Sequence, residues 1–227
     1  MLTGNRVCMS RAQGGNKFYA RHGGNGSLLG QMVKDTRAAV DFMLCRSVLR
    51  HNASLCSQHG YSVSNSGIDK IPYIDPARIF VAGFALGGTV ALHAAALDSR
   101  IAGVASFAGF TPMRSDTLDK PTGGIRRLYD LHALIPRLGL FADSLQDIPY
   151  DYDELLKAIA PRPTLLYTPQ GDRDATFADV AACVNASATA WGDGKGLTHV
   201  APDAISKMEG DEAKALKAWV KTTASQP

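Results

Sequence analysis

The sequence predicts an α/β fold, a doubly wound sandwich built on a mostly parallel sheet. Three short apolar runs lack polar alternation, as strands buried on both faces do. These runs are 79–82, 101–108 and 164–168. With 227 residues, of which 45% are hydrophobic and 20% charged, the chain is large enough for one good core. We therefore expect a single domain over 1–227, with an irregular insertion at 46–74 and a lid-like region at 111–152.

The junction after the first run has the spacing of a nucleophile elbow, which is written G-x-S-x-G and lies between a strand and a helix. Gly83 and Gly87 occupy the glycine positions, Phe84 and Leu86 lie between them, and Ala85 stands where serine belongs. The central residue of an elbow is held in a strained conformation, so we expect both glycines to permit the close approach of strand and helix. The sequence thus predicts the backbone of a nucleophile site without the nucleophile.

Composition narrows the partners and the compartment. The net charge of +3, without a basic block, argues against nucleic acid. No apolar run approaches membrane-spanning length and 1–20 is too polar for a signal peptide, so we expect no membrane. The cysteines show neither C-x-x-C spacing nor scaffold density, which favours free thiols in a reducing, cytoplasmic compartment. They are Cys8, Cys45, Cys56 and Cys183; a Cys45–Cys56 pair is the alternative in a secreted protein.

The N-terminal third is predicted to contain one clear helix. Apolar residues recur at 3.6-residue spacing over 28–44, and Ser27 is placed to cap that helix. We interpret 1–26 as a surface segment and 46–74 as a long polar connection. The stretch that begins at His22, His-Gly-Gly-Asn-Gly, is similar to the H-G-G-G oxyanion motif. That motif should precede the elbow by a further strand and helix, so the assignment is not favoured.

The C-terminal half is predicted to begin with the lid-like region, which contains one helix at roughly 123–135. Its arginines could meet an anionic substrate, although a solvated face is the favoured interpretation. These are Arg114, Arg126, Arg127 and Arg137. The remaining elements are predicted at 153–160 (helix), 164–168 (strand), 176–191 (helix) and 196–202 (strand), before a closing amphipathic helix that includes Ile205, Met208 and Trp219.

A polar loop follows the third strand, where an α/β enzyme places the acid of a catalytic triad. Asp172 or Asp174 could orient a histidine there. The alternative is that one of them caps the next helix, a role that suits Asp174 better. His199, on or just past the last strand, is the nearest candidate for the base.

Together these features resemble the α/β hydrolases of the dienelactone-hydrolase and acetyl-xylan-esterase type, from about Asn16 to Val220. The resemblance implies hydrolysis of carboxylic esters by serine, aspartate and histidine, in that order along the chain. It places Ala85 on the nucleophile, Asp172 on the acid and His199 nearest the base, with the Leu86 amide as one oxyanion donor. The stretches that carry it are 32–35 with 39–41, 75–79, the elbow, 96–103 and 160–163 with the aspartates that follow.

Three departures from the pattern bear on activity. Ala85 has no hydroxyl, so no acyl-enzyme can form through it. The family's histidine lies after the last strand, whereas 202–206 contains none and His199 comes slightly early. The resemblance begins after the family's fourth strand, so the first strands and one oxyanion amide are expected to be absent. The sheet edge thereby exposed favours a homodimer or a cover formed by 1–26 and 46–74.

Two classes of function stay open. The first is a carboxylic ester hydrolase scaffold, inactive as written because alanine replaces the nucleophile. The second is a natural non-catalytic relative, a pseudoenzyme that binds a ligand or a protein through the former cleft. In both we expect a small-molecule ester or related ligand. No cofactor or metal is expected, since neither phosphate-loop nor zinc-ligand spacing occurs.

Other polar residues are weaker candidates. His93 lies inside the elbow helix and is expected to be packed or capping, whereas His132 in the lid-like region could approach the site. Ser106 and Thr111 flank the end of the second strand and could be reached from the site. The histidines in polar segments, which do not resemble a metal set, are His22, His51 and His59.

Overall fold

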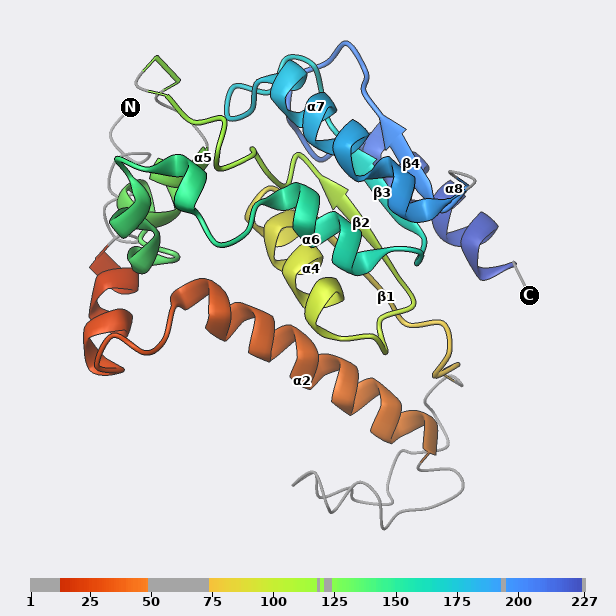
Figure 1. Cartoon of the computed structure of the whole chain (residues 1–227). Helices are drawn as coiled ribbons and strands as arrows, with labels where there is room; N and C mark the ends of the chain where they lie inside the picture. The colour runs from red at the N-terminus through yellow and green to blue at the C-terminus, as the bar shows by residue number, and fades with distance from the viewer. Residues whose placement is uncertain (1–12, 49–73, 118, 121–123, 193–194, 226–227) are drawn as a thin grey trace.

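The computed structural model describes residues 13–48, 74–117, 119–120, 124–192 and 195–225, and the side chains of 46–48 are not described. Four parallel strands form one sheet in chain order (Figure 1). They are β1 (Phe80–Phe84), β2 (Gly103–Phe107), β3 (Thr164–Tyr167) and β4 (Leu197–Val200). The strands predicted at 79–82, 101–108, 164–168 and 196–202 are therefore confirmed.

The register of the sheet brings the strand ends together. Phe84 at the end of β1 lies opposite Phe107 at the end of β2, and Tyr167 at the end of β3 lies opposite Val200 at the end of β4. All residues of β2 and β3 are buried, which explains their unbroken apolar runs. The carboxyl ends of the strands thus share one edge, where open α/β sheets bind ligands.

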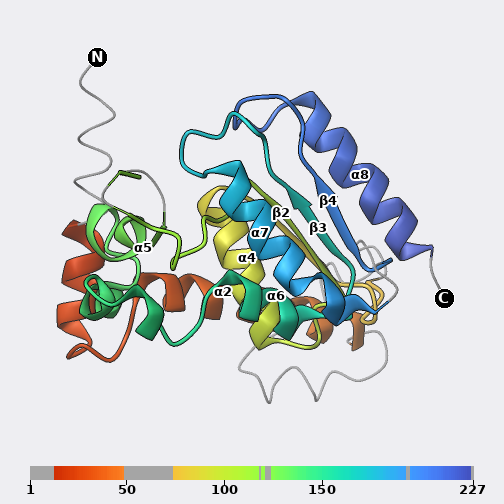
Figure 2. The ribbon, with the colours of Figure 1, turned by 45° about the horizontal axis from the view of Figure 1, so that its top comes forward.

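Helices cover both faces of the sheet, unequally. One face carries α4 (Leu86–Leu97), α6 (Tyr152–Ile159) and α7 (Phe177–Ala188), with α2 (Leu28–Val48) packed against α4. The other face carries α8 (Gly210–Ala224) (Figures 1 and 2). The prediction of a doubly wound sandwich is confirmed.

Each face has its own apolar cluster. On the α4 side, Leu92 and Ile101 are completely buried among side chains from several helices. On the α8 side, Trp219 packs with Phe107 and Tyr167 from the sheet. Burial of such side chains contributes roughly 1.5–3 kcal/mol each relative to exposure. Because β2 and β3 supply side chains to both clusters, they form the centre of the fold.

The helix starts follow local capping chemistry. The Ser27 hydroxyl accepts a hydrogen bond from the Gly30 amide at 2.9 Å, which confirms the predicted cap of α2. A capping box between Asp151 and Glu154 opens α6. The closing helix starts later than predicted: α8 begins at Gly210, and Ile205 and Met208 lie before it with exposed side chains.

The lid-like region is helical but irregular. The predicted helix at 123–135 is replaced by α5 (Gly124–Arg126), one π turn η2 (Arg127–Leu131) and the 3-10 helix η3 (Pro136–Phe141). Ala133, with a φ of 47°, follows η2 in a conformation that a helix does not use. A second 3-10 turn, η4 (Leu145–Asp147), leads toward α6. Helical periodicity alone could not reveal these interruptions.

The sheet has an open edge at β1. Among the described residues β1 pairs only with β2, and Ala82 is exposed. A hollow of about 600 Å³ lies beside this edge, between β1, α2 and α4. Within the described residues the expected short sheet is thus confirmed. The segments proposed to cover it, 1–12 and 49–73, lie outside the described residues, and a homodimer stays a prediction.

The cysteine prediction is partly wrong. Cys45, at the end of the buried stripe of α2, is disulfide-bonded, whereas Cys183 is a buried free thiol. Cys8 and Cys56 lie outside the described residues. Free thiols were the ground for expecting a reducing compartment, so the compartment stays a prediction without that support. Within the described part of the chain, no helix combines the length and apolar character needed to cross a bilayer.

Candidate functional site

The elbow backbone is formed as predicted. Ala85 has φ 50° and ψ −119°, a region that residues with a side chain rarely occupy. Its amide donates to the Phe107 carbonyl at 2.9 Å, and its carbonyl accepts from the Thr89 amide at 3.1 Å. These two bonds hold residue 85 between the end of β2 and the first turn of α4. The local backbone is that of a nucleophile site even though the side chain is a methyl group.

The glycines contribute differently from what the motif suggests. A Cβ on Gly83 would lie 2.1 Å from the Gly87 carbonyl carbon, so Gly83 is required. A Cβ on Gly88 would meet the Ser106 hydroxyl at 2.6 Å and Gly109 Cα at 2.8 Å. At Gly87 an added Cβ meets nothing within 4 Å. The expectation is therefore right for Gly83 and wrong for Gly87, and Gly88 is the second glycine that permits close packing.

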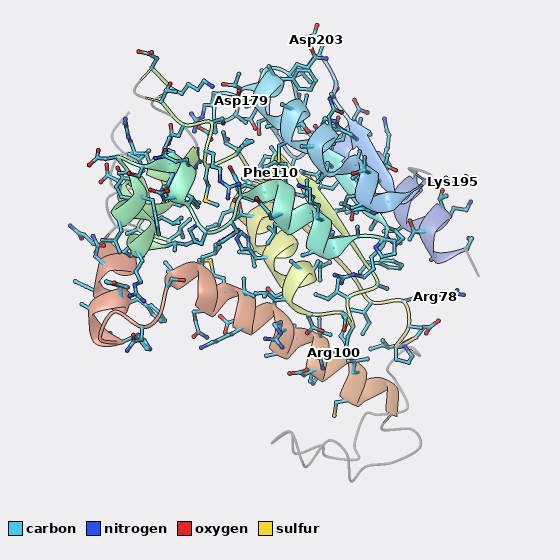
Figure 3. All side chains as sticks on the ribbon, in the orientation of Figure 1. Arg78, Arg100, Phe110, Asp179, Lys195 and Asp203 are labelled. Atoms are coloured by element: carbon cyan, nitrogen blue, oxygen red, sulfur yellow. The ribbon has the colours of Figure 1, made fainter. Side chains whose placement is uncertain are left out.

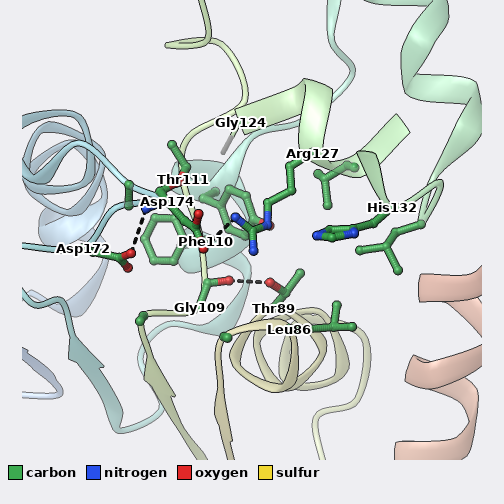
Figure 4. A pocket seen from close by; sticks show the side chains of 16 residues that line it. Leu86, Thr89, Gly109, Phe110, Thr111, Gly124, Arg127, His132, Asp172 and Asp174 are labelled. Atoms are coloured by element: carbon green, nitrogen blue, oxygen red, sulfur yellow. Dashed lines mark hydrogen bonds and ion pairs between the residues drawn. The ribbon is translucent and has the colours of Figure 1, made fainter. Parts of the chain in front are cut away.

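A cavity of about 100 Å³ opens next to Ala85, at the carboxyl ends of the strands. Its walls come from three places: the start of α4, the loop after β2, and the loop after β3, with the α5–η2 segment lying over them (Figure 4). The polar side chains on its walls are Thr89, Thr111, Arg127, His132, Tyr152, Asp172 and Asp174. The fold thus gathers the predicted nucleophile position and the predicted acids at one cavity.

The two aspartates are held in different ways. Asp172 Oδ1 accepts a hydrogen bond from the Asp174 amide at 2.9 Å, and burial raises the pKa of the Asp172 carboxyl. Asp174 Oδ2 lies 2.7 Å from Arg127 Nη1 in an ion pair. The alternative in which Asp174 caps the next helix is wrong, because α7 begins at Phe177 with Thr176 at its cap position.

Two basic residues of the α5–η2 side face the cavity. Figure 4 shows the Arg127 guanidinium above the start of α4, with His132 on one side of it and the aspartates on the other. Arg127 lines the cavity, so the interpretation of a purely solvated face is wrong for this arginine. Arg114, which is equally exposed, does not line the cavity and pairs with Glu154 at 2.9 Å. Spacing could not separate these arginines, because only the tertiary fold turns one of them inward.

His199 lies elsewhere. It is on β4, opposite Leu166, and its Nε2 is 2.6 Å from the Thr168 hydroxyl. Burial lowers the pKa of its imidazole. It does not line the Ala85 cavity. The structure therefore brings Ala85 and Asp172 together and leaves His199 apart, while His132 is the histidine at the cavity.

The remaining polar candidates differ in whether they line the cavity. His93 is buried, with Nε2 3.0 Å from the Tyr150 hydroxyl and Nδ1 2.8 Å from the Thr89 carbonyl, which confirms a packed histidine. Ser106 is 2% exposed and does not line the cavity, so it cannot be reached from there. Thr111 does line it and donates to the Asp174 carbonyl at 2.7 Å. His22 is exposed near the end of the helix over 13–21 and is not part of the cavity; His51 and His59 lie outside the described residues.

The start of α4 supplies donors. Leu86 is the first residue of the helix and lines the cavity, and the first amides of a helix have no acceptor within it. Such amides, with the positive end of the helix dipole, stabilise negative charge that develops beside them. Together with Arg127 they make this wall suited to a carbonyl oxygen or a carboxylate.

No protein-family model and no curated protein matches the sequence. Solved structures do match the fold, and three glucuronoyl esterases are among them. The enzyme from Solibacter usitatus superposes over 88% of this chain and 50% of its own length, with a TM-score of 0.62 and 14% identity. The enzyme from Caldicellulosiruptor kristjansonii superposes over 67% of this chain and 45% of its own length, with a TM-score of 0.57 and 20% identity.

A third match is an alanine variant of an esterase. It is a serine-to-alanine variant of the glucuronoyl esterase from Sporotrichum thermophile, in complex with methyl 4-O-methyl-beta-D-glucopyranuronate. It covers 67% of this chain and 45% of its own, with a TM-score of 0.55 and 17% identity. The fold is that of the α/β hydrolases. The chain spans half or less of the length of these esterases, from 45% to 50%.

Proposed function

We propose that this chain carries the acyl-binding site of a carboxylic ester hydrolase of the serine–histidine–aspartate type, inactive as written because Ala85 occupies the nucleophile position. The observation that carries the proposal is the backbone of Ala85, at φ 50° and ψ −119° between β1 and α4, facing a cavity with acidic and basic side chains. Elbow strain of this kind costs about 1–3 kcal/mol and is kept where it serves a site.

The roles follow from what lines the cavity. The Leu86 amide at the start of α4 supports an oxyanion donor. His132 lines the cavity and His199 does not, so we assign proton transfer to His132. Asp172, with its raised pKa, and Asp174, paired with Arg127, provide the acidic side.

The cavity has mixed walls, with Leu86, Leu128 and Leu134 beside the polar residues. A few polar groups on an apolar wall are typical of small-molecule sites. The proposed substrates are therefore small esters.

The test is hydrolysis of p-nitrophenyl acetate by the protein as it stands and by Ala85→Ser, side by side. We expect a gain of several orders of magnitude in the variant. The introduced hydroxyl would lose its proton to His132 and add to the ester carbonyl, and the alcohol would leave with that proton. The matched control is Ala85→Gly, which lacks a hydroxyl and should not gain. No gain in a folded Ala85→Ser variant overturns the proposal.

A second candidate has its own observation. Arg127 and the start of α4 face the same cavity, an arrangement that binds carboxylates without any nucleophile. In this alternative the chain is a non-catalytic relative that binds a small carboxylic acid. Titration calorimetry with acetate should then show binding that is lost in Arg127→Met. Absence of binding, combined with a gain of hydrolysis in Ala85→Ser, excludes this alternative.

A further inference from the structure

The turn that carries His132 follows η2 and is bonded back to it. The His132 amide donates a hydrogen bond to the Arg127 carbonyl at 3.2 Å. His132 and Leu134 both line the cavity next to Ala85, and Ala133 between them is completely buried. The position of the His132 imidazole at the cavity therefore depends on where the backbone of Ala133 lies.

The backbone of Ala133 has a conformation that residues with a side chain rarely adopt. Its φ is 47°. Such a conformation persists where the surrounding structure fixes it, and it is concentrated at functional sites. Ala85 and Ala108, the other non-glycine residues with positive φ in the described part of the chain, both line the cavity. The turn at Ala133 is thus strained in the same way as the cavity walls, and contacts from other segments must hold it.

The helix over 13–21 supplies such a contact through Gly15. Gly15 is buried, and a Cβ on it would overlap the Ala133 carbonyl oxygen and lie 3.0 Å from the carbonyl carbon. Only glycine therefore lets this helix pack against the turn. A second contact comes from α2, because the Leu29 amide donates to the Leu134 carbonyl at 3.1 Å. Figures 1 and 2 both show the first helix of the described chain, in red, beside the green segment that contains α5.

The neighbouring glycine, Gly14, has no such contact. It is exposed, and an added Cβ would meet nothing within 4 Å. Glycine inside a helix is unfavourable relative to alanine. At position 15 the close approach to Ala133 accounts for the glycine, so the two adjacent positions differ in what they do for the turn.

We propose that Gly15 is a positioning residue of the hydrolytic site, which seats the backbone of Ala133 and thereby holds His132 at the cavity. The inference rests on the proposed function, in which His132 transfers the proton. Gly15 does not line the cavity, so it acts only through the turn. A displacement of about 1 Å caused at a distance from the chemistry is enough to lower a rate about 10²-fold. The helix over 13–21 is thus part of the site and more than a surface segment.

The test compares Gly15→Ala with Gly14→Ala, each combined with Ala85→Ser, in hydrolysis of p-nitrophenyl acetate. We expect Gly15→Ala to lower kcat about 10²-fold with little change in KM, because the added Cβ displaces Ala133 without touching the walls of the cavity. Gly14→Ala should leave both constants unchanged. The proposal is overturned if Gly15→Ala, folded by its thermal melt, keeps its kcat, or if the two variants lose equally.

A second measurement does not depend on hydrolysis. Two-dimensional ¹H–¹³C NMR of the histidine rings follows His132 in the chain that keeps Ala85, and His132→Asn identifies its signal by removing it. We expect this signal to shift in Gly15→Ala and to keep its place in Gly14→Ala. An unshifted signal in Gly15→Ala overturns the proposal even if kcat falls. If Ala85→Ser gains no activity, the proposed function fails, and this spectrum still decides whether Gly15 holds His132.

Ala133→Gly reaches the same turn from its other side and decides the matter if Gly15→Ala does not fold. Glycine adopts a positive φ without strain, so this variant should fold, and it removes the methyl group that lies 3.0 Å from the Cβ position of Gly15. The turn is then held less firmly. We expect a severalfold lower kcat in the Ala85→Ser background, whereas an unchanged kcat and an unchanged His132 signal overturn the proposal.

Discussion

The two ends of α4 are built to opposite principles. At its start, Ala85 is strained and the first amides face a cavity. At its end, Asp98 accepts from Arg100 Nη2 at 2.6 Å, and Arg162 donates to the carbonyls of Ala95, Asp98 and Ile101 at 2.6, 3.0 and 2.9 Å. At the second end, these polar groups are hydrogen-bonded or ion-paired to other groups of the protein. Those of the first end face the cavity that we propose as the acyl-binding site.

The end of α4 at Asp98 also links α4 to α2. Arg100 contacts Asp98 and, at 2.5 Å, Asp41 on α2, and Arg37 on α2 lies 3.4 Å from Asp98. The hydrogen bond from Arg100 is the main cause of the lowered pKa of Asp98, which is about 2. Asp98 is nearly inaccessible to solvent, so these contacts are poorly screened. Figure 3 shows Arg100 beside α2 at this end of α4, and the contacts there stabilise the fold.

The largest effect should come from Gly83→Ala. Its Cβ would lie 2.1 Å from the Gly87 backbone, so strand and helix must separate, at a cost of several kcal/mol or complete loss of folding. Gly87→Ala is the matched control, because its Cβ meets nothing within 4 Å and should change the free energy of unfolding by less than about 1 kcal/mol. Urea denaturation of both variants measures the difference. Equal losses of stability in the two variants would contradict the assignment of Gly83 as the glycine that the close approach of strand and helix requires.

The second-largest effect should come from a change at Asp98, at the C-terminal end of α4. Asp98→Asn should lower the free energy of unfolding by about 2 kcal/mol near neutral pH, since it removes a carboxylate held by two arginines. The pKa of Asp98 is lower in the folded state than its ordinary value of 3.8, so its contribution is present above that pH and is lost as the pH falls toward about 2. Thermal melts from pH 6 to pH 2 should therefore converge for the two proteins. A constant gap across that range would contradict the ion-pair account.

The smallest effect should have the opposite sign. Ala85→Gly removes the penalty of a positive φ, and Gly also makes the unfolded chain more flexible, so the net stabilisation should be up to about 1 kcal/mol. At the control position Ala94, which is buried in the middle of α4, the same change to Gly should destabilise by at least about 1 kcal/mol. Chemical denaturation decides. Destabilisation by Ala85→Gly would mean that residue 85 is not strained.

The sequence allowed the fold and half of the site to be predicted. Buried strands and the elbow depend on local patterns, so β1, β2 and β3 and the conformation at Ala85 followed from apolar runs and glycine spacing. Asp172 followed from its place after a strand. These features are encoded within a few neighbouring residues, which is why one sequence sufficed.

The rest of the site depends on contacts between distant segments. Arg127 enters the cavity because α5 and η2 fold over the start of α4, and a helical pattern says nothing of that direction. Gly88 is needed because β2 brings Ser106 against it, 18 residues further along the chain in the printed sequence. His132 was distinguishable from other histidines only through its place in the lid-like region. Its position at the cavity depends on the tertiary fold, which the local sequence does not reveal.

We propose that Ala85 stands in an otherwise assembled hydrolytic site with His132 as its base. The most direct measurement is p-nitrophenyl acetate hydrolysis by Ala85→Ser, alone and combined with His132→Asn or with His199→Asn. We predict a large gain with serine, a loss of about 10²-fold or more when His132 is also changed, and little change when His199 is changed. A gain that survives His132→Asn but disappears with His199→Asn would contradict the assignment of the base. No gain in folded Ala85→Ser would contradict the hydrolytic site itself.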